Sequence, residues 1–312
     1  ADYIQRKINL RYNPKSDIIV TVGGSEAIDI SIRAVVDNGD EVIIPEPSFV
    51  CYSPIVKLTG GVPVIIETKA EEKFKLKADD LEKAITEKTK LLILPYPNNP
   101  TGAIMTKEDL EPIAAVLRKY NIAVITDEIY SELTYSDKHY SIAQCEGMRE
   151  RTILINGFSK AFAMTGWRLG FLCAPSEFVA QILKIHQYAI MCSPTVSQYA
   201  AIVALKDCED EVLKMKEEYN LRRRYCVSEF NRIGLDCFEP EGAFYVFPSI
   251  KSTGLTSDEF CERLLKEKGV AVIPGTAFGD SGEGYIRVSY AYSIKHLTTA
   301  ITKISQFLSE IK

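Results

Sequence analysis

Short runs of apolar, β-branched residues alternate with amphipathic stretches over the first two thirds of this 312-residue chain. Several runs, such as Leu-Leu-Ile-Leu and Ile-Ala-Val-Ile-Thr, are apolar at successive positions, which is typical of strands covered on both faces. Their alternation with helices predicts a mostly parallel sheet with crossover helices. We expect seven strands, at residues 18–22, 41–44, 63–67, 91–94, 122–126, 152–156 and 169–173. We expect the flanking helices at residues 26–36, 78–87, 107–119, 176–188 and 195–206.

The pattern changes near residue 208, where a long charged stretch begins. This stretch predicts one extended helix that ends at Gly234. Beyond it we expect strands at 243–248, 270–274 and 285–290, and helices at 257–268 and from Lys295. The predicted fold class is therefore α/β, with a large domain over residues 1–215 and a smaller C-terminal α+β domain over residues 216–312.

Composition excludes several classes of protein. The chain has 37 Lys and Arg against 42 Asp and Glu, a net charge of −5, so nothing favours nucleic acid or an anionic membrane surface. No apolar run reaches the roughly 20 residues that span a bilayer, and the first residues lack a secretory signal. Eight cysteines without a Cys-x-x-Cys pair indicate free thiols in a reducing compartment, so we expect a cytoplasmic protein. Three dispersed histidines predict no metal site.

Residues with useful chemistry follow four of the expected strands. They are the glycine turn 23–25 after the first, the amide of Asn99 after the fourth, Asp127 with Tyr130 after the fifth, and Lys160 after the sixth. Ligands of open α/β sheets bind beyond the carboxyl ends of the strands. We therefore expect these residues to share one site.

The glycine turn suits a phosphate. Gly23, Gly24 and Ser25 open a helix, and free N–H groups, the helix dipole and a hydroxyl together bind anions. A plain strand–helix turn with Ser25 as the N-cap explains the same residues. The stretch matches neither Gly-x-Gly-x-x-Gly nor a Walker loop, so by itself it gives little support to nucleotide binding.

Lys160 lies in an otherwise apolar stretch that runs to Arg168. Loss of solvation lowers the pKa of a lysine and frees its amine as a nucleophile, although a solvated surface position is the usual case. Arg168, beside the only tryptophan, is a candidate phosphate clamp or an ordinary ion-pair partner.

Asp127 follows an apolar strand, so its carboxylate needs a cationic or hydrogen-bonding partner. With Glu128 it could ligate a metal, but adjacent strand residues point to opposite faces, which disfavours that reading. It could equally cap a helix, and Tyr130 shares its site if the chain turns helical. A lysine, an acid and an anion cradle together suggest pyridoxal phosphate, which needs one of each.

A series of stretches then carries a family resemblance. The chain resembles the pyridoxal-phosphate-dependent aminotransferases of the aspartate aminotransferase family, the fold-type-I, class I/II group in its prokaryotic branch. Asn-Pro-Thr-Gly together with Ser-Lys-x-Phe-x-x-Thr-Gly-Trp-Arg-x-Gly is highly specific. The stretches, in family order, are TVGGSEA (21–27), PEPSFVCY (45–52), NNPTG (98–102), DEIY (127–130), SKAFAMTGWRLGF (159–171), GAFY (242–245) and YIRVSYA (285–291).

The resemblance implies catalytic roles for Lys160, Asp127 and Tyr130. Lys160 would form the Schiff base with the cofactor and move the proton at the substrate α-carbon. Asp127 would keep the pyridine nitrogen protonated. Tyr130 and Asn99 would hydrogen-bond the phenolic oxygen of the cofactor. Asn99 and Arg287 form the implied substrate site, in which Arg287 binds the α-carboxylate bidentately.

The resemblance also implies the rest of the cofactor site. Gly23, Gly24 and Ser25 would contact the phosphate, Arg168 would clamp it, and Phe49 would stack on the ring. The bond between residues 99 and 100 would be cis, which an X–Pro bond adopts at modest cost.

Two departures from the family pattern stand out. Where the family has a hydroxyl three residues before the lysine, this chain has Gly157, and we expect Ser159 to replace that phosphate contact. The N-terminal arm of the family has no counterpart ahead of Ala1. We expect the arm to be missing from this sequence and not from the working enzyme.

The expected function is transfer of the amino group of an L-amino acid, aspartate or aromatic, to a 2-oxo acid such as 2-oxoglutarate, in a homodimer with shared active sites. Phe49, Tyr52 and the stretch 242–245 suit an aromatic side chain, or serve as core or cofactor contacts. A β- or α,γ-eliminating lyase, such as a C–S lyase, uses the same machinery. A pyridoxal-phosphate-binding sensor domain is the alternative of a different class, although the chain shows no basic helix-turn-helix segment.

Overall fold

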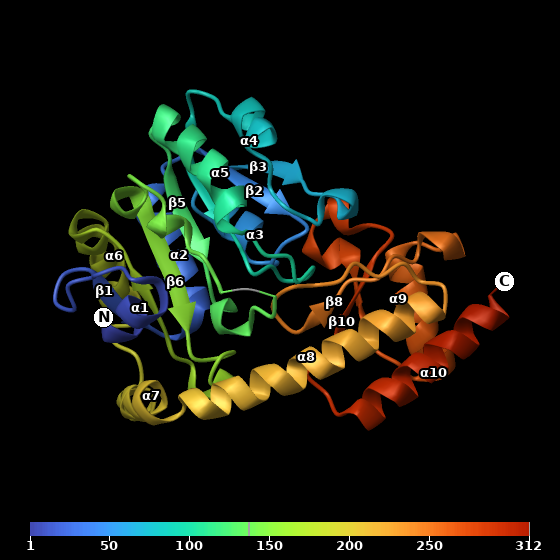
Figure 1. Cartoon of the computed structure of the whole chain (residues 1–312). Coiled ribbons are helices and arrows are strands. Elements are labelled where there is room, and N and C mark those ends of the chain that lie inside the picture. Colours follow the sequence, from blue (N-terminus) through green and yellow to red (C-terminus); the bar gives the residue numbers. More distant parts are fainter. Residues whose placement is uncertain (137, 312) are drawn as a thin grey trace.

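The computed structural model of the protein describes residues 1–136 and 138–311 (Figure 1). Its larger part is a seven-stranded sheet in the order β1-β7-β6-β5-β4-β2-β3, with helices on both faces. The strands are β1 (Ile18–Thr21), β2 (Glu41–Glu46), β3 (Val62–Glu67), β4 (Thr89–Leu94), β5 (Ala123–Asp127), β6 (Thr152–Gly157) and β7 (Gly170–Cys173). Only β7 runs against its neighbours, β6 and β1. The predicted seven-stranded, mostly parallel sheet is confirmed.

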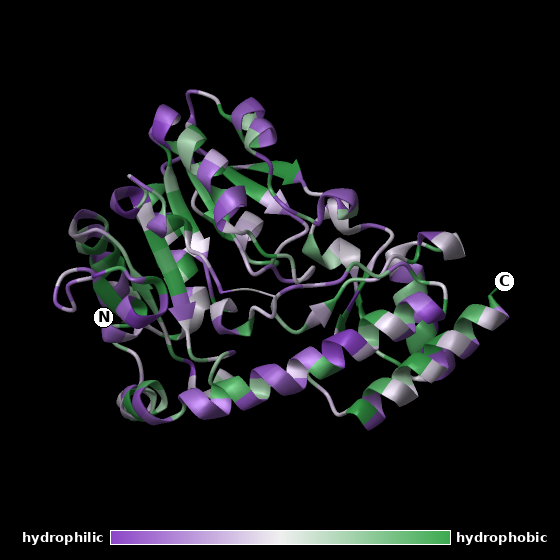
Figure 2. Ribbon diagram, in the orientation of Figure 1, coloured by the Kyte–Doolittle hydropathy of each residue, from purple (hydrophilic) through white to green (hydrophobic). Residues whose placement is uncertain are grey.

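Both faces of this sheet are buried. In β4, Leu91 and Ile93 pack with residues of α2 (Gly23–Val35) and α6 (Ser176–Ala189). Leu92 and Leu94 point the other way and pack with residues of α5 (Lys107–Tyr120). Because strand side chains alternate, one unbroken apolar run supplies both cores. Figure 2 shows hydrophobic strands between helices that carry many hydrophilic residues.

The remaining helices of this part are α1 (Asp2–Ile8), α3 (Tyr52–Leu58), α4 (Ala78–Ala84) and α7 (Thr195–Asp207). All five predicted flanking helices are present. α5 begins at a capping box in which Thr106 and Asp109 satisfy each other's backbone N–H groups. α3 was not predicted, because it spans only seven residues and Pro54 lies within it.

One interpretation of α2 is wrong. The helix begins at Gly23, with Val22 as its N-cap, so Ser25 lies inside the first turn and does not cap it. The N–H of Val22 donates instead to the carboxylate of Glu26, whose other oxygen lies 2.7 Å from Nδ1 of His186 on α6. This partly buried contact links the start of α2 to α6.

The C-terminal part is built on an antiparallel sheet in the order β8-β10-β9, formed by β8 (Tyr245–Val246), β9 (Ile273–Pro274) and β10 (Ile286–Ser289). Three helices, α8 (Glu209–Arg232), α9 (Ser257–Lys268) and α10 (Ile294–Glu310), accompany it and share a separate apolar core. α8 runs from beside the large sheet to this smaller unit (Figure 1). β8 and β9 are shorter than predicted, because each pairs only with the four-residue β10.

Short 3-10 helices occupy several loops: η1 (Ala70–Glu72), η2 (Ser131–Leu133), η3 (Ile142–Gln144), η4 (Arg149–Arg151), η5 (Thr165–Trp167), η6 (Lys251–Thr253), η7 (Gly275–Phe278) and η8 (Asp280–Gly282). The eight cysteines are free thiols, as predicted. Within the described ranges, no helix is long and apolar enough to cross a membrane.

Candidate active site

A cavity of about 210 Å³ lies where the carboxyl ends of β1, β4, β5 and β6 meet the start of β7. Ten of the eleven predicted site residues line it: Gly24, Ser25, Phe49, Asn99, Asp127, Tyr130, Ser159, Lys160, Arg168 and Arg287. The eleventh, Gly23, lies against the guanidinium of Arg168. The cavity is also lined by Ile28, Tyr52, Pro95, Pro97, Ile129, Thr165 and Tyr245. The strand ends therefore converge as the sequence predicts.

Lys160 follows β6 and presents its amine to aromatic rings. Its Nζ lies 5.7 Å from the ring centre of Tyr130 and 5.5 Å from that of Phe244. Burial lowers the pKa of the Lys160 amine, and the positive charges of Arg287 and Arg168 lower it further. A larger fraction of this amine is therefore uncharged near neutral pH than of a solvated lysine.

Asp127 is the last residue of β5 and is buried. Its carboxylate accepts a hydrogen bond of 2.7 Å from the hydroxyl of Tyr52 and one of 3.2 Å from the N–H of Ile129. Burial raises the pKa of Asp127, while these two hydrogen bonds oppose that shift. A carboxylate with this environment pairs strongly with any cation that enters the cavity.

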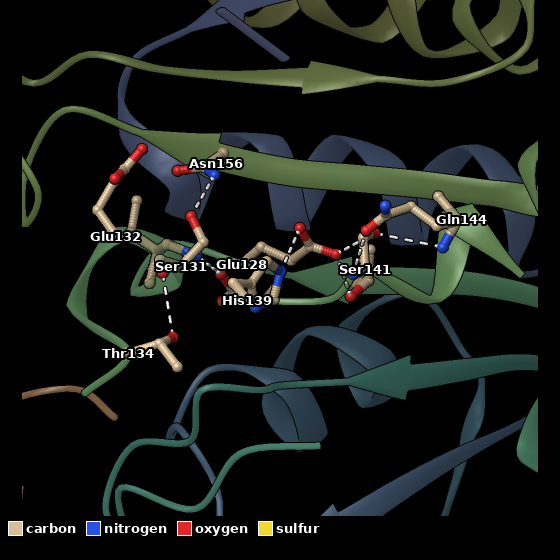
Figure 3. Close-up of polar contacts among 12 residues, drawn as sticks. Glu128, Ser131, Glu132, Thr134, His139, Ser141, Gln144 and Asn156 are labelled. Atoms are coloured by element: carbon tan, nitrogen blue, oxygen red, sulfur yellow. Dashed lines mark hydrogen bonds and ion pairs between the residues drawn. The ribbon is translucent and has the colours of Figure 1, made fainter. Parts of the chain in front are cut away.

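Glu128 points away from the cavity. Its carboxylate accepts hydrogen bonds from Thr126 and Ser141 and lies 2.8 Å from Nε2 of His139, as Figure 3 shows for His139 and Ser141. The reading of Asp127 and Glu128 as a pair of metal ligands is therefore wrong, because neighbouring strand residues face opposite sides. In the part of the chain that the structure describes, no three His, Cys, Asp or Glu side chains are grouped to hold a metal.

Glycines allow the turn at the start of α2 to pack closely against Arg168 and β7, and we call the turn and the arginine together the cradle. Gly23 has φ +77°, and a Cβ there would lie 2.6 Å from the Arg168 guanidinium. A Cβ on Gly170 would lie 2.6 Å from the carbonyl carbon of Gly23 and 2.7 Å from the nitrogen of Gly24. A side chain at Gly23 would press on the guanidinium, and one at Gly170 would press on the backbone of the turn. The first turn of α2 and the guanidinium thus face one small volume.

A side chain at Gly157 would be crowded. Gly157 pairs with Gly170 across β6 and β7, and a Cβ at 157 would lie 3.0 Å from the Gly170 Cα and 3.0 Å from the Ile129 side chain. Ser159 lines the cavity instead, and its carbonyl accepts a 2.8 Å hydrogen bond from the hydroxyl of Thr165. Ser159 thus remains a candidate to replace the contact.

Asn99 and Arg287 form another part of the cavity wall. Nη1 of Arg287 donates a 2.8 Å hydrogen bond to Oδ1 of Asn99. The guanidinium lies between two rings, 4.5 Å from the centre of Tyr245 and 4.7 Å from that of Phe278. The Asn99–Pro100 bond is cis, as the resemblance implies. A forked cation held this firmly suits a carboxylate.

Two contacts of this site were missed from the sequence. Tyr52 was expected as part of an aromatic substrate pocket or as a core or cofactor contact, yet its hydroxyl donates a hydrogen bond to Asp127, 75 residues away. Tyr245 was considered in the same way, yet its hydroxyl lies 3.0 Å from that of Tyr130 and its ring faces Arg287. Nothing in the local pattern indicates either contact, because each joins segments 75 or more residues apart in the chain.

Comparison with known proteins agrees with this geometry. The family described as Aminotransferase class I and II matches residues 1–304. The chain is 53% identical over 306 residues to YugH of Bacillus subtilis, covering 98% of this chain and 79% of YugH. It is 47% identical to an aspartate aminotransferase of Pyrococcus abyssi, covering all of this chain and 81% of that protein.

Solved structures show the same fold. The crystal structure of an aromatic aminotransferase from Pyrococcus horikoshii superposes with a TM-score of 0.97 at 46% identity, covering 99% of this chain and 84% of that one. Similarity of this extent includes the whole cavity and both sheets. The chain therefore belongs to the class I and II aminotransferases, pyridoxal-phosphate-dependent enzymes of fold type I that transfer amino groups.

Proposed function

We propose that the cavity binds pyridoxal phosphate and transfers the amino group of an L-amino acid, aspartate or an aromatic one, to a 2-oxo acid such as 2-oxoglutarate. One observation carries the proposal: Asp127, Arg287 and the pair Lys160 and Arg168 line the same cavity although they come from three separate segments, the end of β5, β10 and the connection between β6 and β7. A surface lysine and unrelated ion pairs would not converge in this way.

The residues present fit the cofactor. The glycine turn at the start of α2 and the clamp of Arg168 form a cradle of N–H groups and positive charge that suits a phosphate. Asp127 supplies the buried anion that a protonated ring nitrogen needs, and Phe49 lines the wall beside it. When bound, pyridoxal phosphate supplies an aldehyde that amines condense with and a ring that withdraws electrons from the substrate α-carbon.

Each residue of the cavity would then have a separate role. The Lys160 amine, uncharged more often than a solvated lysine, would hold and return the α-carbon proton. Asp127, held by Tyr52, would keep the ring nitrogen protonated. Tyr130 and Asn99 would hydrogen-bond the phenolic oxygen, and Arg287 would hold the substrate α-carboxylate. Gly23, Gly24, Ser25, Ser159 and Arg168 would hold the phosphate.

The cradle gives a steric prediction. Gly170→Ala should weaken binding of pyridoxal phosphate to the apoenzyme about tenfold or more, because overpacking costs about 1–3 kcal/mol and the new Cβ would press on the backbone of Gly23 and Gly24. The fluorescence of Trp167, which adjoins Arg168, can follow the titration. Gly166→Ala is the matched control, because a Cβ there meets nothing within 4 Å. Equal affinities of the two variants would contradict the cradle.

Several wider features belong to the same proposal. Tyr188, Met191, Val196 and Tyr199 are large and exposed on α6, α7 and the loop between them, and such apolar surface supports pairing with a second copy of the chain.

We place the domain boundary at residue 215, within α8, because the large sheet precedes it and the small sheet follows it. Free thiols throughout suit the cytoplasm.

A panel of amino donors tests the reaction and narrows the substrate. The holoenzyme is mixed with single L-amino acids without a 2-oxo acid, and the change of its visible absorption to that of the aminated cofactor is recorded. We expect aspartate or an aromatic amino acid to react fastest, and 2-oxoglutarate to reverse the change. Release of pyruvate and ammonia without a stable spectral change would instead identify an eliminating lyase.

A further inference from the structure

We infer that Tyr245 is a positioning residue that couples the substrate-carboxylate site at Arg287 to the hydroxyl of Tyr130. The inference rests on the proposed function, and it assigns Tyr245 a role in addition to lining the cavity. Its hydroxyl lies 3.0 Å from the hydroxyl of Tyr130, and its ring centre lies 4.5 Å from the guanidinium carbon of Arg287. One side chain therefore touches both groups.

The position of Tyr245 in the fold makes it a bridge. Tyr245 begins β8, which pairs with β10, the strand that carries Arg287. Tyr130 belongs to the loop after β5 of the large sheet. Tyr130 and Tyr245 are both buried, and their rings meet edge to face at 5.9 Å. The pair of hydroxyls thus joins the two parts of the molecule beside the cavity.

The direction of the hydrogen bond follows from donor count. A phenol has one O–H to donate and lone pairs to accept. If Tyr130 donates into the cavity, toward the cofactor oxygen, its own oxygen must accept the proton of Tyr245. Chains of hydroxyls polarise one another, so this arrangement makes Tyr130 a stronger donor.

The charge of Arg287 reaches this chain of hydroxyls through the ring of Tyr245. Burial raises the pKa of Tyr245, while the hydrogen bond to Tyr130 and the positive charge of Arg287 oppose that rise. A cation over the ring makes the phenol a better donor. When a carboxylate neutralises Arg287, Tyr245 becomes a weaker donor, and the hydrogen bond that Tyr130 makes weakens with it.

The decisive variant is Tyr245→Phe, which keeps the ring under Arg287 and removes only the hydroxyl. The visible absorption of the holoenzyme is titrated with pH, alone and with succinate or 3-phenylpropionate, which are carboxylates without an amino group. Without the hydroxyl of residue 245, the anionic cofactor oxygen is less well stabilised. The pH midpoint of the absorption change should therefore rise by roughly half to one pH unit. The shift caused by the carboxylates should shrink to about half or less of its wild-type size. kcat should fall while KM changes less than about twofold, because the ring still holds Arg287.

A double-mutant cycle shows whether Tyr245 acts through Tyr130. In a Tyr130→Phe background, the additional Tyr245→Phe change should no longer move the midpoint. Tyr219→Phe is the matched control, because Tyr219 packs on Phe244 in the same aromatic cluster, with ring centres 5.6 Å apart. Tyr245→Leu repeats the comparison if the phenylalanine variant does not fold, with the additional expectation that KM rises.

The outcomes separate the two proposals. A wild-type enzyme that gains no visible absorption with pyridoxal phosphate contradicts the proposed function. If the wild-type enzyme shows the visible band but Tyr245→Phe does not change the pH midpoint of that band, only the coupling is overturned. The same holds if Tyr245→Phe shifts the midpoint equally in the wild-type and Tyr130→Phe backgrounds.

Discussion

Replacing Lys160 with alanine should lower amino-group transfer by roughly 10⁴-fold or more, because the same amine serves as nucleophile and as proton carrier. Lys160 follows β6 and presents its amine to the cavity, where burial and two arginines lower its pKa. Initial rates with the preferred donor and 2-oxoglutarate measure the loss. A small added amine should restore part of the activity, since the vacated volume can admit it.

A covalent readout accompanies the rate. After borohydride treatment, the wild-type peptide containing residue 160 should gain the mass of the reduced cofactor, whereas Lys160→Ala should not. Lys160→Arg keeps the positive charge and should be equally inactive. Lys216→Ala removes a partly buried lysine outside this cavity and should retain activity. Full turnover by Lys160→Ala would refute the assigned chemistry.

The second large effect is expected at Asp127, with opposite signs for activity and stability. Asp127→Asn should lower kcat/KM about 10³-fold, the size typical of a lost electrostatic partner, because a neutral amide cannot hold a protonated ring nitrogen. The amide can still accept from the N–H of Ile129 and donate to the hydroxyl of Tyr52, so the local packing should persist.

The apoenzyme of the same variant should be more stable than wild type at neutral pH. Burial raises the pKa of Asp127, so the native state binds more protons than the unfolded state between the ordinary carboxyl pKa of about 3.9 and the raised native value. Stability therefore falls as pH rises through this window and stays lower above it. Asparagine has no charge to bury and removes this loss of stability. The melting temperature of the variant should therefore exceed that of the wild type by an amount that grows from about pH 4 upward.

Thermal unfolding of both apoenzymes at several pH values measures the gain, at about 2–4 °C for each kcal/mol in a chain of this size. Glu128→Gln is the control, because Glu128 is equally buried but faces His139 and Ser141 behind the strand. It should lose stability and keep turnover within about tenfold of wild type, as expected for a broken buried hydrogen-bond network. A less stable Asp127→Asn apoenzyme at neutral pH would contradict the argument.

Much of the large sheet and its site could be predicted from the sequence because the signals are local. Continuous apolar runs such as residues 91–94 indicate strands buried on both faces, and all seven strands are present. Parallel strands in one sheet bring their carboxyl ends to one edge, so the sequence alone could place Asp127, Lys160 and the glycine turn together. Element ends were harder to predict, and the alternative reading of Ser25 as an N-cap was wrong, because capping depends on the geometry of a single turn.

The sequence alone determined which chemical groups this chain brings to the edge of its sheet, because the positions of the strands along the chain and the alternation of their side chains follow from patterns a few residues long. Only the tertiary structure decided which of those groups touch. Tyr52 reaches Asp127, Tyr245 joins Tyr130 to Arg287, and Gly157 faces Gly170 so closely that a Cβ would be crowded. The tyrosine contacts link segments far apart in the chain, and all three depend on packing to within an ångström, which no local pattern encodes.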